Sequence, residues 1–195
     1  MVLLHLILRQ LNTMAFKDTT LIFEDDKLSI DNGRSVMMRW ETPIMEKTSE
    51  YICQSKGDIL EIGFGMGICA DFIQAEGVKS HTIIELHPQV IEKLKVWAED
   101  KDNVIIVEGD WYDAELNQTY DGIFLDTYAD EHWDEFKEFA LSKAKSGARV
   151  SYFDNGWTEN EHRFDNISYE YLPVKPEEEG HICTEDIYPM AKVVI

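Results

Sequence analysis

Glu41 and Asp126 are two acids whose positions allow both carboxylates to face one pocket. Asp126 directly follows the apolar segment Tyr120 to Leu125, which predicts a strand, and ligands of parallel α/β sheets bind beyond the carboxyl ends of the strands. Glu41 stands just before a helix that we expect to start near Pro43. Paired carboxylates suit a guanidinium group, which is planar and forked, and a carboxylate that takes a proton from it can act as a base. The ordinary alternative is that Asp126 caps the following loop and Glu41 is a surface acid.

A glycine-rich turn is the second chemical signal. Residues 58–62 predict a short strand, and a helix is expected from Ile68. Within and after that strand the sequence places an acid and then glycines at alternate positions: Glu61, Gly63, Gly65 and Gly67. Glycine lets the backbone turn tightly and approach a ligand, and the following helix N-terminus offers free N–H groups. This arrangement is typical of the first βα turn of nucleotide-binding folds, although the glycines can also serve only to shape the turn.

Further acids and an aromatic residue follow the next two predicted strands. Glu85 ends one strand and lies 20 positions after Gly65, a spacing at which an acid binds ribose hydroxyls. The strand Val104 to Val107 leads to Asp110 and Trp111. In this type of fold the region flanks an adenine, so Asp110 can accept a hydrogen bond from the adenine amino group and Trp111 can stack on the ring. Alternatively, Asp110 is a turn residue and Trp111 is a core aromatic.

Strands and helices alternate along most of the chain, which predicts an α/β fold with a mostly parallel, seven-stranded sheet. A β-hairpin over residues 19–30 precedes this pattern. We expect one domain, in which residues 1–57 form an N-terminal cap over the active site and residues 58–195 form a Rossmann-like core. The predicted core strands are 58–62, 81–85, 104–107, 120–125, 149–153, 168–174 and 188–195, and the predicted helices are 43–53, 68–76, a helix opened by Pro88, and 130–144.

The charge of the chain is strongly negative: 18 Lys and Arg stand against 38 Asp and Glu, for a net charge of −20 over 195 residues. Such a field repels nucleic acid and anionic membranes and favours cationic ligands, although a highly soluble surface explains it as well. Cys53, Cys69 and Cys183 form no CxxC pair, and neither they nor the dispersed histidines suggest a metal site, which is typical of a reduced, cytoplasmic protein. Met1 to Leu11 is apolar but too short to span a bilayer and lacks a signal cleavage pattern, so we expect a docking helix there.

Four segments resemble a known family. They are Val36–Met45, Leu60–Gly67, Ile83–Glu85 and Asp121–Tyr128, and together they are similar to guanidinoacetate N-methyltransferase and to its relative, the fungal arginine δ-N-methyltransferase. The alternate glycines likewise resemble motif I of S-adenosylmethionine (AdoMet) methyltransferases. The resemblance covers about residues 20 to 155 and implies the Rossmann-like fold of class I AdoMet methyltransferases.

The resemblance also implies roles for individual residues. Glu41 and Asp126 are expected to grip a guanidino group, with Asp126 as the base and Trp40 as a further substrate-binding residue. AdoMet (after transfer, S-adenosyl-L-homocysteine) is expected to contact Met37, Met45, Glu61, Gly63, Phe64, Gly65, Met66, Gly67, Ile68, Cys69, Glu85, Leu86, His87, Asp110, Trp111, Tyr112 and Asp126.

The expected substrate turn departs from the family pattern. Asp154, Asn155 and Gly156 follow the fifth core strand, where the guanidinoacetate enzyme binds its substrate's carboxylate, and an acid at Asp154 does not suit a small carboxylate. The predicted function is AdoMet-dependent methyl transfer to a guanidino nitrogen of a small molecule, such as guanidinoacetate, arginine or a related compound. The alternatives are a protein-arginine N-methyltransferase, a non-catalytic AdoMet-binding protein and a nicotinamide-dependent oxidoreductase. No nucleic acid, membrane or metal partner is expected.

Overall fold

Seven strands form one mostly parallel sheet in the computed structural model, which describes residues 16–130, 132–153, 164–176 and 186–195. The strand order is β6-β5-β4-β7-β8-β10-β9. β10 runs antiparallel to β8 and β9, whereas the other neighbouring pairs are parallel, so the predicted sheet is confirmed. The strands are β4 (Asp58–Ile62), β5 (Ser80–Glu85), β6 (Val104–Glu108), β7 (Tyr120–Leu125), β8 (Ala144–Tyr152), β9 (Ser168–Pro173) and β10 (Ile187–Val194).

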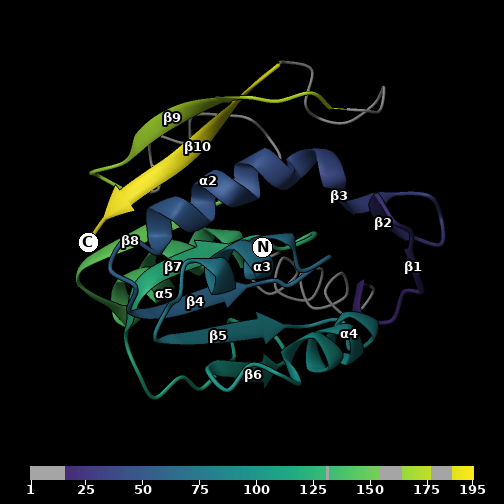
Figure 1. The fold of residues 1–195 in the computed structure, drawn as a ribbon, viewed down its shortest axis with the longest axis horizontal. Helices are drawn as coiled ribbons and strands as arrows, with labels where there is room; N and C mark the ends of the chain where they lie inside the picture. The colour runs from purple at the N-terminus through teal and green to yellow at the C-terminus, as the bar shows by residue number, and fades with distance from the viewer. Residues whose placement is uncertain (1–15, 131, 154–163, 177–185) are drawn as a thin grey trace, which may run out of the picture.

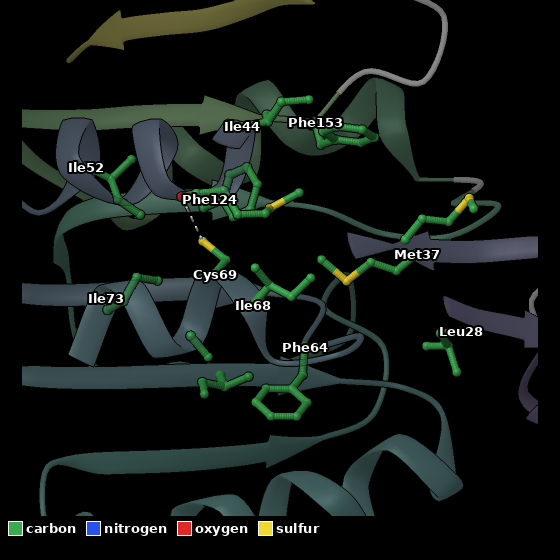
Figure 2. Packing of buried hydrophobic residues seen from close by; sticks show 14 of the residues in the cluster. Leu28, Met37, Ile44, Ile52, Phe64, Ile68, Cys69, Ile73, Phe124 and Phe153 are labelled. Atoms are coloured by element: carbon green, nitrogen blue, oxygen red, sulfur yellow. Dashed lines mark hydrogen bonds between the residues drawn. The ribbon is translucent and has the colours of Figure 1, made fainter. Parts of the chain in front are cut away.

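The central sheet separates two hydrophobic clusters, because successive residues of a strand face opposite sides. The helices are α2 (Thr42–Ile52), α3 (Ile68–Ala75), α4 (Pro88–Ala98) and α5 (Phe136–Lys143). On one side, Ile59 and Phe124 pack with residues of α2, α3 and α4, as Figure 2 shows in part. On the other side, Leu60 and Ile123 pack with α5. The apolar strand segments found in the sequence are therefore covered on both faces.

A small antiparallel sheet precedes the core. It consists of β1 (Leu21–Phe23), β2 (Lys27–Ile30) and β3 (Ser35–Met38), of which β1 and β2 confirm the predicted hairpin and β3 was not predicted. In Figure 1 the arrows of β4, β5 and β6 point toward this sheet. The small sheet therefore lies on the side of the core where ligands of parallel sheets bind.

The start of α2 differs by one residue from the sequence prediction. A 3-10 turn, Arg39–Glu41, connects β3 to α2. The helix expected from Pro43 begins at Thr42, and Glu41 occupies the N-cap position. The Thr42 hydroxyl donates to the Arg39 carbonyl oxygen at 2.6 Å. Pro43 still fits, because the first turn of a helix has no intrahelical partner for its N–H groups.

The helix expected over residues 130–144 starts later than predicted. It begins at Phe136, because a 3-10 turn, Trp133–Glu135, precedes it. Phe136 and Ala140 are buried, as expected from their spacing, whereas Trp133 and Phe139 are half-buried. The segment after β7 is therefore mostly loop, which leaves more of it available to shape a site.

β8 starts earlier than predicted. It begins at Ala144 instead of Arg149, and its pairing with β7 is irregular between Tyr120 and Gly122. Within this irregular part of the strand, Gly147 has a φ of +83°.

Some sequence predictions fall outside the described residues. These are the N-terminal docking helix over Met1–Leu11 and any role of Cys183. The described cysteines, Cys53 and Cys69, are buried free thiols. Of the helices that the structure describes, none combines the length and apolarity needed to cross a membrane.

The irregular part of β8 carries Lys145, which binds two carboxylates at the amino edge of the sheet. Its Nζ atom donates to Asp58 at 2.7 Å and to Asp121 at 2.6 Å. The Asp121 carboxylate also accepts the Asp58 backbone N–H at 2.7 Å. These bonds join the starts of β4, β7 and β8. The bond from Lys145 is the main reason that the pKa of Asp58 is lowered to about 2.

Replacing Lys145 by Met removes this cation but keeps most of the aliphatic side chain. Because the pKa of Asp58 is depressed on folding, its ionised form stabilises the protein above about pH 4, and this contribution is lost as the pH falls toward 2. We expect Lys145→Met to lower the free energy of unfolding by about 1 kcal/mol at neutral pH and by less in acid, as measured by urea denaturation. Lys95→Met, which removes an exposed cation from Glu92 and Glu108, is the control. An equal loss at both pH values would contradict this role of Lys145.

Candidate active site

A cavity of about 720 Å³, measured with its opening to solvent, lies at the carboxyl edge of the parallel strands. Its wall combines the ends of β4, β5 and β7, the loop after β6, and residues of β2 and β3. The predicted site residues that line it are Met37, Gly63, Gly65, Glu85, Leu86, Asp110, Trp111 and Asp126. The predicted site residues outside this lining are Trp40, Glu41, Met45, Glu61, Phe64, Met66, Gly67, Ile68, Cys69, His87 and Tyr112. Asp154, Asn155 and Gly156 fall outside the described residues.

The glycine-rich turn brings the end of β4 against the loop after β7. Gly63 has a φ of +92°, and a Cβ atom there would come within 1.9 Å of the Asp126 carbonyl oxygen. Gly65 has a φ of +54°, and a Cβ atom there would lie 2.7 Å from the Met37 Sδ atom. That sulfur accepts the Met66 N–H at 3.3 Å. The turn depends on glycine, because glycine adopts positive φ freely and leaves room for these contacts.

Glu85 is buried at the end of β5 and is oriented by the backbone. Its Oε2 atom accepts the Phe64 N–H and its Oε1 atom accepts the His87 N–H, both at 2.8 Å. Burial raises the pKa of Glu85, while backbone hydrogen bonds from His87, Phe64, Leu86 and Gly65 lower it. These backbone donors hold the carboxylate at the cavity wall. Its contact with ribose hydroxyls stays a prediction.

The Asp126 carboxylate opens onto the cavity but is otherwise surrounded by protein. The Asp126 backbone N–H donates to the Ile62 carbonyl oxygen at 2.9 Å, which continues the pairing of β4 with β7. Within the described part of the chain, no hydrogen-bond donor reaches the Asp126 side chain. Burial, followed by the charges of Glu61 and Glu85, raises the pKa of Asp126 to about 7. Such a carboxylate is stabilised by a cation placed next to it.

Glu41 lies close enough to Asp126 for the two carboxylates to repel each other. It is 5% exposed, and its Oε1 atom accepts the Met38 N–H at 2.8 Å. Burial and then the charge of Asp126 raise the pKa of Glu41 well above its ordinary value, while the Met38 bond lowers it. Glu41 is thus a buried acid and not the surface acid of the alternative interpretation. The fold brings the two predicted catalytic acids into one electrostatic environment, with Asp126 facing the cavity.

Trp111 is a core aromatic residue that also forms cavity wall. Its side chain is 4% exposed and packs edge to face on Phe139, with 4.9 Å between the ring centres. Its Nε1–H donates to Asp130 at 2.7 Å. Asp110 accepts the Tyr112 N–H at 3.0 Å, so it shapes a turn and also lines the cavity. Trp111 and Asp110 therefore both have a structural role and also line the cavity. Their contact with adenine stays a prediction.

Two residues of the predicted cofactor site have other partners. Glu61 is buried beneath the turn, where its Oε2 atom lies 2.9 Å from His81 Nε2. His87 caps α4: its Nδ1 atom accepts the Gln89 N–H at 3.2 Å, and its Nε2 atom lies 3.2 Å from the Thr19 carbonyl oxygen. These side chains support the turn and the helix from outside the cavity lining. No group of three or more His, Cys, Asp or Glu residues in the described segments is arranged to hold a metal ion.

Several lining residues go beyond the sequence predictions. The Phe16 ring lies 5.1 Å from the His87 ring and 4.8 Å from the Tyr128 ring, measured between ring centres. No sequence signal marks Phe16, because its contacts with His87 and Tyr128 join segments that are distant in the sequence. Thr127, Tyr128 and Asp130 also line the cavity. The strand-end rule that identified Asp126 would have found these three if it had been applied to the whole turn after β7.

The family description "Guanidinoacetate N-methyltransferase" matches residues 13–168 of the chain. The chain belongs to this family. The matched segment includes the small sheet, the glycine-rich turn, Glu85 and Asp126. The resemblance found in the sequence is therefore confirmed.

Curated relatives of this family member are named protein arginine N-methyltransferase 2. The protein from Saccharomyces cerevisiae is 42% identical over an alignment of 137 residues, and the match covers 63% of this chain and 33% of that protein. The protein from Candida glabrata is 40% identical over an alignment of 133 residues, and the match covers 62% of this chain and 32% of that protein. The chain therefore spans about a third of the length of these curated relatives.

Solved structures share the fold of this family member at low sequence identity. The N-methyltransferase NodS from Bradyrhizobium japonicum, in complex with S-adenosyl-L-homocysteine, has a TM-score of 0.64 at 11% identity over 80% of this chain and 87% of that chain. The spermidine synthase from Thermotoga maritima has a TM-score of 0.59 at 14% identity over 90% of this chain and 72% of that chain. These similarities confirm the predicted Rossmann-like α/β fold.

Gly63→Ala and Gly65→Ala are a matched pair of substitutions in the turn. Both place alanine at a positive φ, which costs about 1 kcal/mol. At position 65 the close neighbour is the flexible end of Met37, whereas at position 63 it is the backbone carbonyl oxygen of Asp126. We expect Gly63→Ala to lower the free energy of unfolding by about 2 kcal/mol more than Gly65→Ala, as measured by urea denaturation. Equal losses would contradict the close contact between the turn and Asp126.

Proposed function

We propose that this chain is an AdoMet-dependent N-methyltransferase that transfers a methyl group to a guanidino nitrogen of a small molecule. The observation that carries the proposal is the Asp126 carboxylate, which faces the cavity without a donor from the described residues and has a pKa raised to about 7 by burial. A cationic group in front of Asp126 would relieve this electrostatic cost, and Glu41 places a second carboxyl group nearby. Membership of the family supports a guanidinium as that cation.

AdoMet suits the rest of the cavity. Glu85 places a buried, backbone-oriented carboxylate at the cavity wall, and the positive φ angles of Gly63 and Gly65 let a ligand approach the backbone. Asp110 and Trp111 lie where an adenine is expected in such folds. When bound, AdoMet supplies an electrophilic methyl group on its sulfonium. S-Adenosyl-L-homocysteine in the NodS structure, which has the same fold, supports this cofactor.

Asp126 is proposed to orient the guanidino group and to accept its proton. A guanidinium is a poor nucleophile because its lone pairs are delocalised and its pKa is above about 12. When the new N–CH₃ bond forms, that nitrogen loses a proton, which Asp126 can take and pass to solvent. Most of the remaining rate is expected to come from holding the nitrogen in line with the methyl group. The burial that raises the pKa of Asp126 in the free site makes it a stronger base than an exposed carboxylate.

The choice of guanidino compound separates two versions of the proposal. A small molecule, such as guanidinoacetate or arginine, is the first version. An arginine residue within a protein is the second, and it is favoured by the names of the curated relatives. The chain spans about a third of those relatives, so their activity does not transfer with the similarity.

A panel assay tests the proposal directly. The protein is mixed with AdoMet carrying a labelled methyl group and, separately, with guanidinoacetate, arginine, agmatine and an arginine-containing peptide. We expect label to appear in at least one guanidino compound, because the cavity presents a carboxylate suited to that group. Calorimetry with S-adenosylhomocysteine is the control for cofactor binding. Normal cofactor binding with no transfer to any compound would overturn the proposed reaction and favour a non-catalytic AdoMet-binding protein.

Asp126→Asn removes the proposed base and keeps its shape. We expect kcat to fall by at least about 100-fold, because general-base catalysis contributes that much, while affinity for S-adenosylhomocysteine stays within a few-fold of the wild type. In the wild type, kcat/KM for the guanidino substrate should rise with pH through about 7, as Asp126 ionises. Asp113→Asn removes the same charge from an exposed position and is the control. Turnover like that of the wild type in Asp126→Asn would remove Asp126 from the mechanism.

The raised pKa of Asp126 also predicts a pH-dependent stability. Because the folded protein holds this proton more tightly than the unfolded chain, the stability that the protonated group provides is lost as the pH rises from about 4 through about 7. Asp126→Asn lacks this titration. Without ligand, it should therefore become increasingly more stable than the wild type as the pH rises through this window. Thermal unfolding of both proteins at several pH values measures the difference, and a constant difference would contradict the raised pKa.

A further inference from the structure

One carboxylate accepts three hydrogen bonds from two walls of the cavity. Asp130 Oδ2 accepts the Trp111 Nε1–H and the Thr127 hydroxyl, each at 2.7 Å. Asp130 Oδ1 accepts the His132 backbone N–H at 2.8 Å. These are short distances, as expected for bonds to a charged acceptor. Asp130 therefore uses both of its oxygens to join separate segments of the chain.

The joined segments belong to different halves of the cavity. Trp111 follows β6, in the half where an adenine is expected, and it is locked by ring contacts with Phe136 and Phe139. Thr127 follows Asp126 in the turn after β7. Trp111, Thr127 and Asp130 all line the cavity. The Asp130 carboxylate is thus a direct link between the wall of the cofactor half and the turn that carries the proposed base.

The backbone next to Asp130 is strained. Ala129 has a φ of +52°, in the left-handed region that residues with a Cβ atom rarely adopt. Strained residues persist only where the surrounding structure fixes them, and they cluster at functional sites. The bonds made by Asp130 are the contacts that fix this turn on its C-terminal side, while the Asp126 backbone N–H fixes the other side through its bond to Ile62.

We propose that Asp130 is a positioning residue, which holds the Asp126–Tyr128 turn against the Trp111 wall so that the methyl donor and acceptor are aligned. The effect of Asp130 on catalysis rests on the proposed methyl transfer. Its effect on cofactor binding rests on the cavity alone. A displacement of about 1 Å in such an alignment is enough to cost about 100-fold in rate. Asp130 acts through Thr127 and Trp111 and takes no part in the chemistry itself.

An asparagine cannot replace Asp130 without loss. A carboxylate accepts at both oxygens, whereas the Asn side chain carries one acceptor and one NH₂ donor. In Asp130→Asn the NH₂ group must face either the His132 N–H or the pair of donors from Trp111 and Thr127. At least one bond is therefore lost, while the volume of the side chain is kept.

The test combines Asp130→Asn with the removal of its two side-chain donors by Trp111→Phe and Thr127→Val. We expect Asp130→Asn to weaken S-adenosylhomocysteine binding about 10-fold and to lower kcat at saturating AdoMet about 10-fold. The double variant Trp111→Phe/Thr127→Val should show both losses. Adding Asp130→Asn to that double variant should change either value by less than about twofold, because the bonds that it breaks are already absent. Asp113→Asn is the control for the loss of charge.

The outcomes separate a positioning role from a merely structural one. A lower unfolding temperature of Asp130→Asn with affinity and kcat like those of the wild type would overturn the proposal. Fully additive losses in the triple variant would also overturn it, because Asp130 would then act through other groups. The calorimetric titration with S-adenosylhomocysteine needs no methyl transfer. It therefore tests whether Asp130 supports cofactor binding, even if no guanidino compound is methylated and the proposed function fails.

Discussion

At the carboxyl edge of the sheet, the backbone of Gly63 lies close to the end of the neighbouring strand, β7. A Cβ atom at position 63 would come within 1.9 Å of the Asp126 carbonyl oxygen. This contact places the glycine-rich turn and the proposed base side by side. It depends on the parallel pairing of β4 with β7, which ends in the bond from the Asp126 N–H to Ile62. The glycine-rich turn and the proposed base therefore lie at the same edge of the sheet, and the loops around them supply the other walls of the cavity.

The buried acids at the carboxyl edge of the sheet differ in the groups that surround their carboxylates. The Glu61 carboxylate faces His81, and the Glu85 carboxylate accepts backbone N–H groups. The Asp126 side chain has no donor among the described residues, and burial raises its pKa to about 7. Isolated charges are costly in such surroundings unless a partner arrives. Without a ligand, the buried Asp126 carboxylate therefore lowers the stability of the site. A cationic ligand would offset this cost, in keeping with the net charge of −20.

The features that the sequence predicts correctly are those that depend on local spacing. They are the parallel core, the glycine-rich turn and the position of Asp126 after a strand end. The sequence does not predict the irregular start of β8, which depends on pairing with β7, or the 3-10 turn that delays the start of α5. The contact of Phe16 with Tyr128 and the bond of Asp130 with Trp111 were also missed, since each joins segments that are distant in the sequence. The role of Glu61 in cofactor binding stays a prediction, and its buried partner, His81, was not foreseen.

Proton release on ligand binding measures the proposed role of Asp126 most directly. Below about pH 7 this carboxylate holds a proton in the free site, and a guanidinium bound next to it must lower its pKa and expel that proton. Calorimetry of the S-adenosylhomocysteine complex with guanidinoacetate, arginine or an arginine peptide, in buffers with different ionisation enthalpies, counts the protons released. We expect net release at about pH 6 in the wild type and its loss in Asp126→Asn. Binding without proton release, or equal release in both proteins, would contradict the role of Asp126.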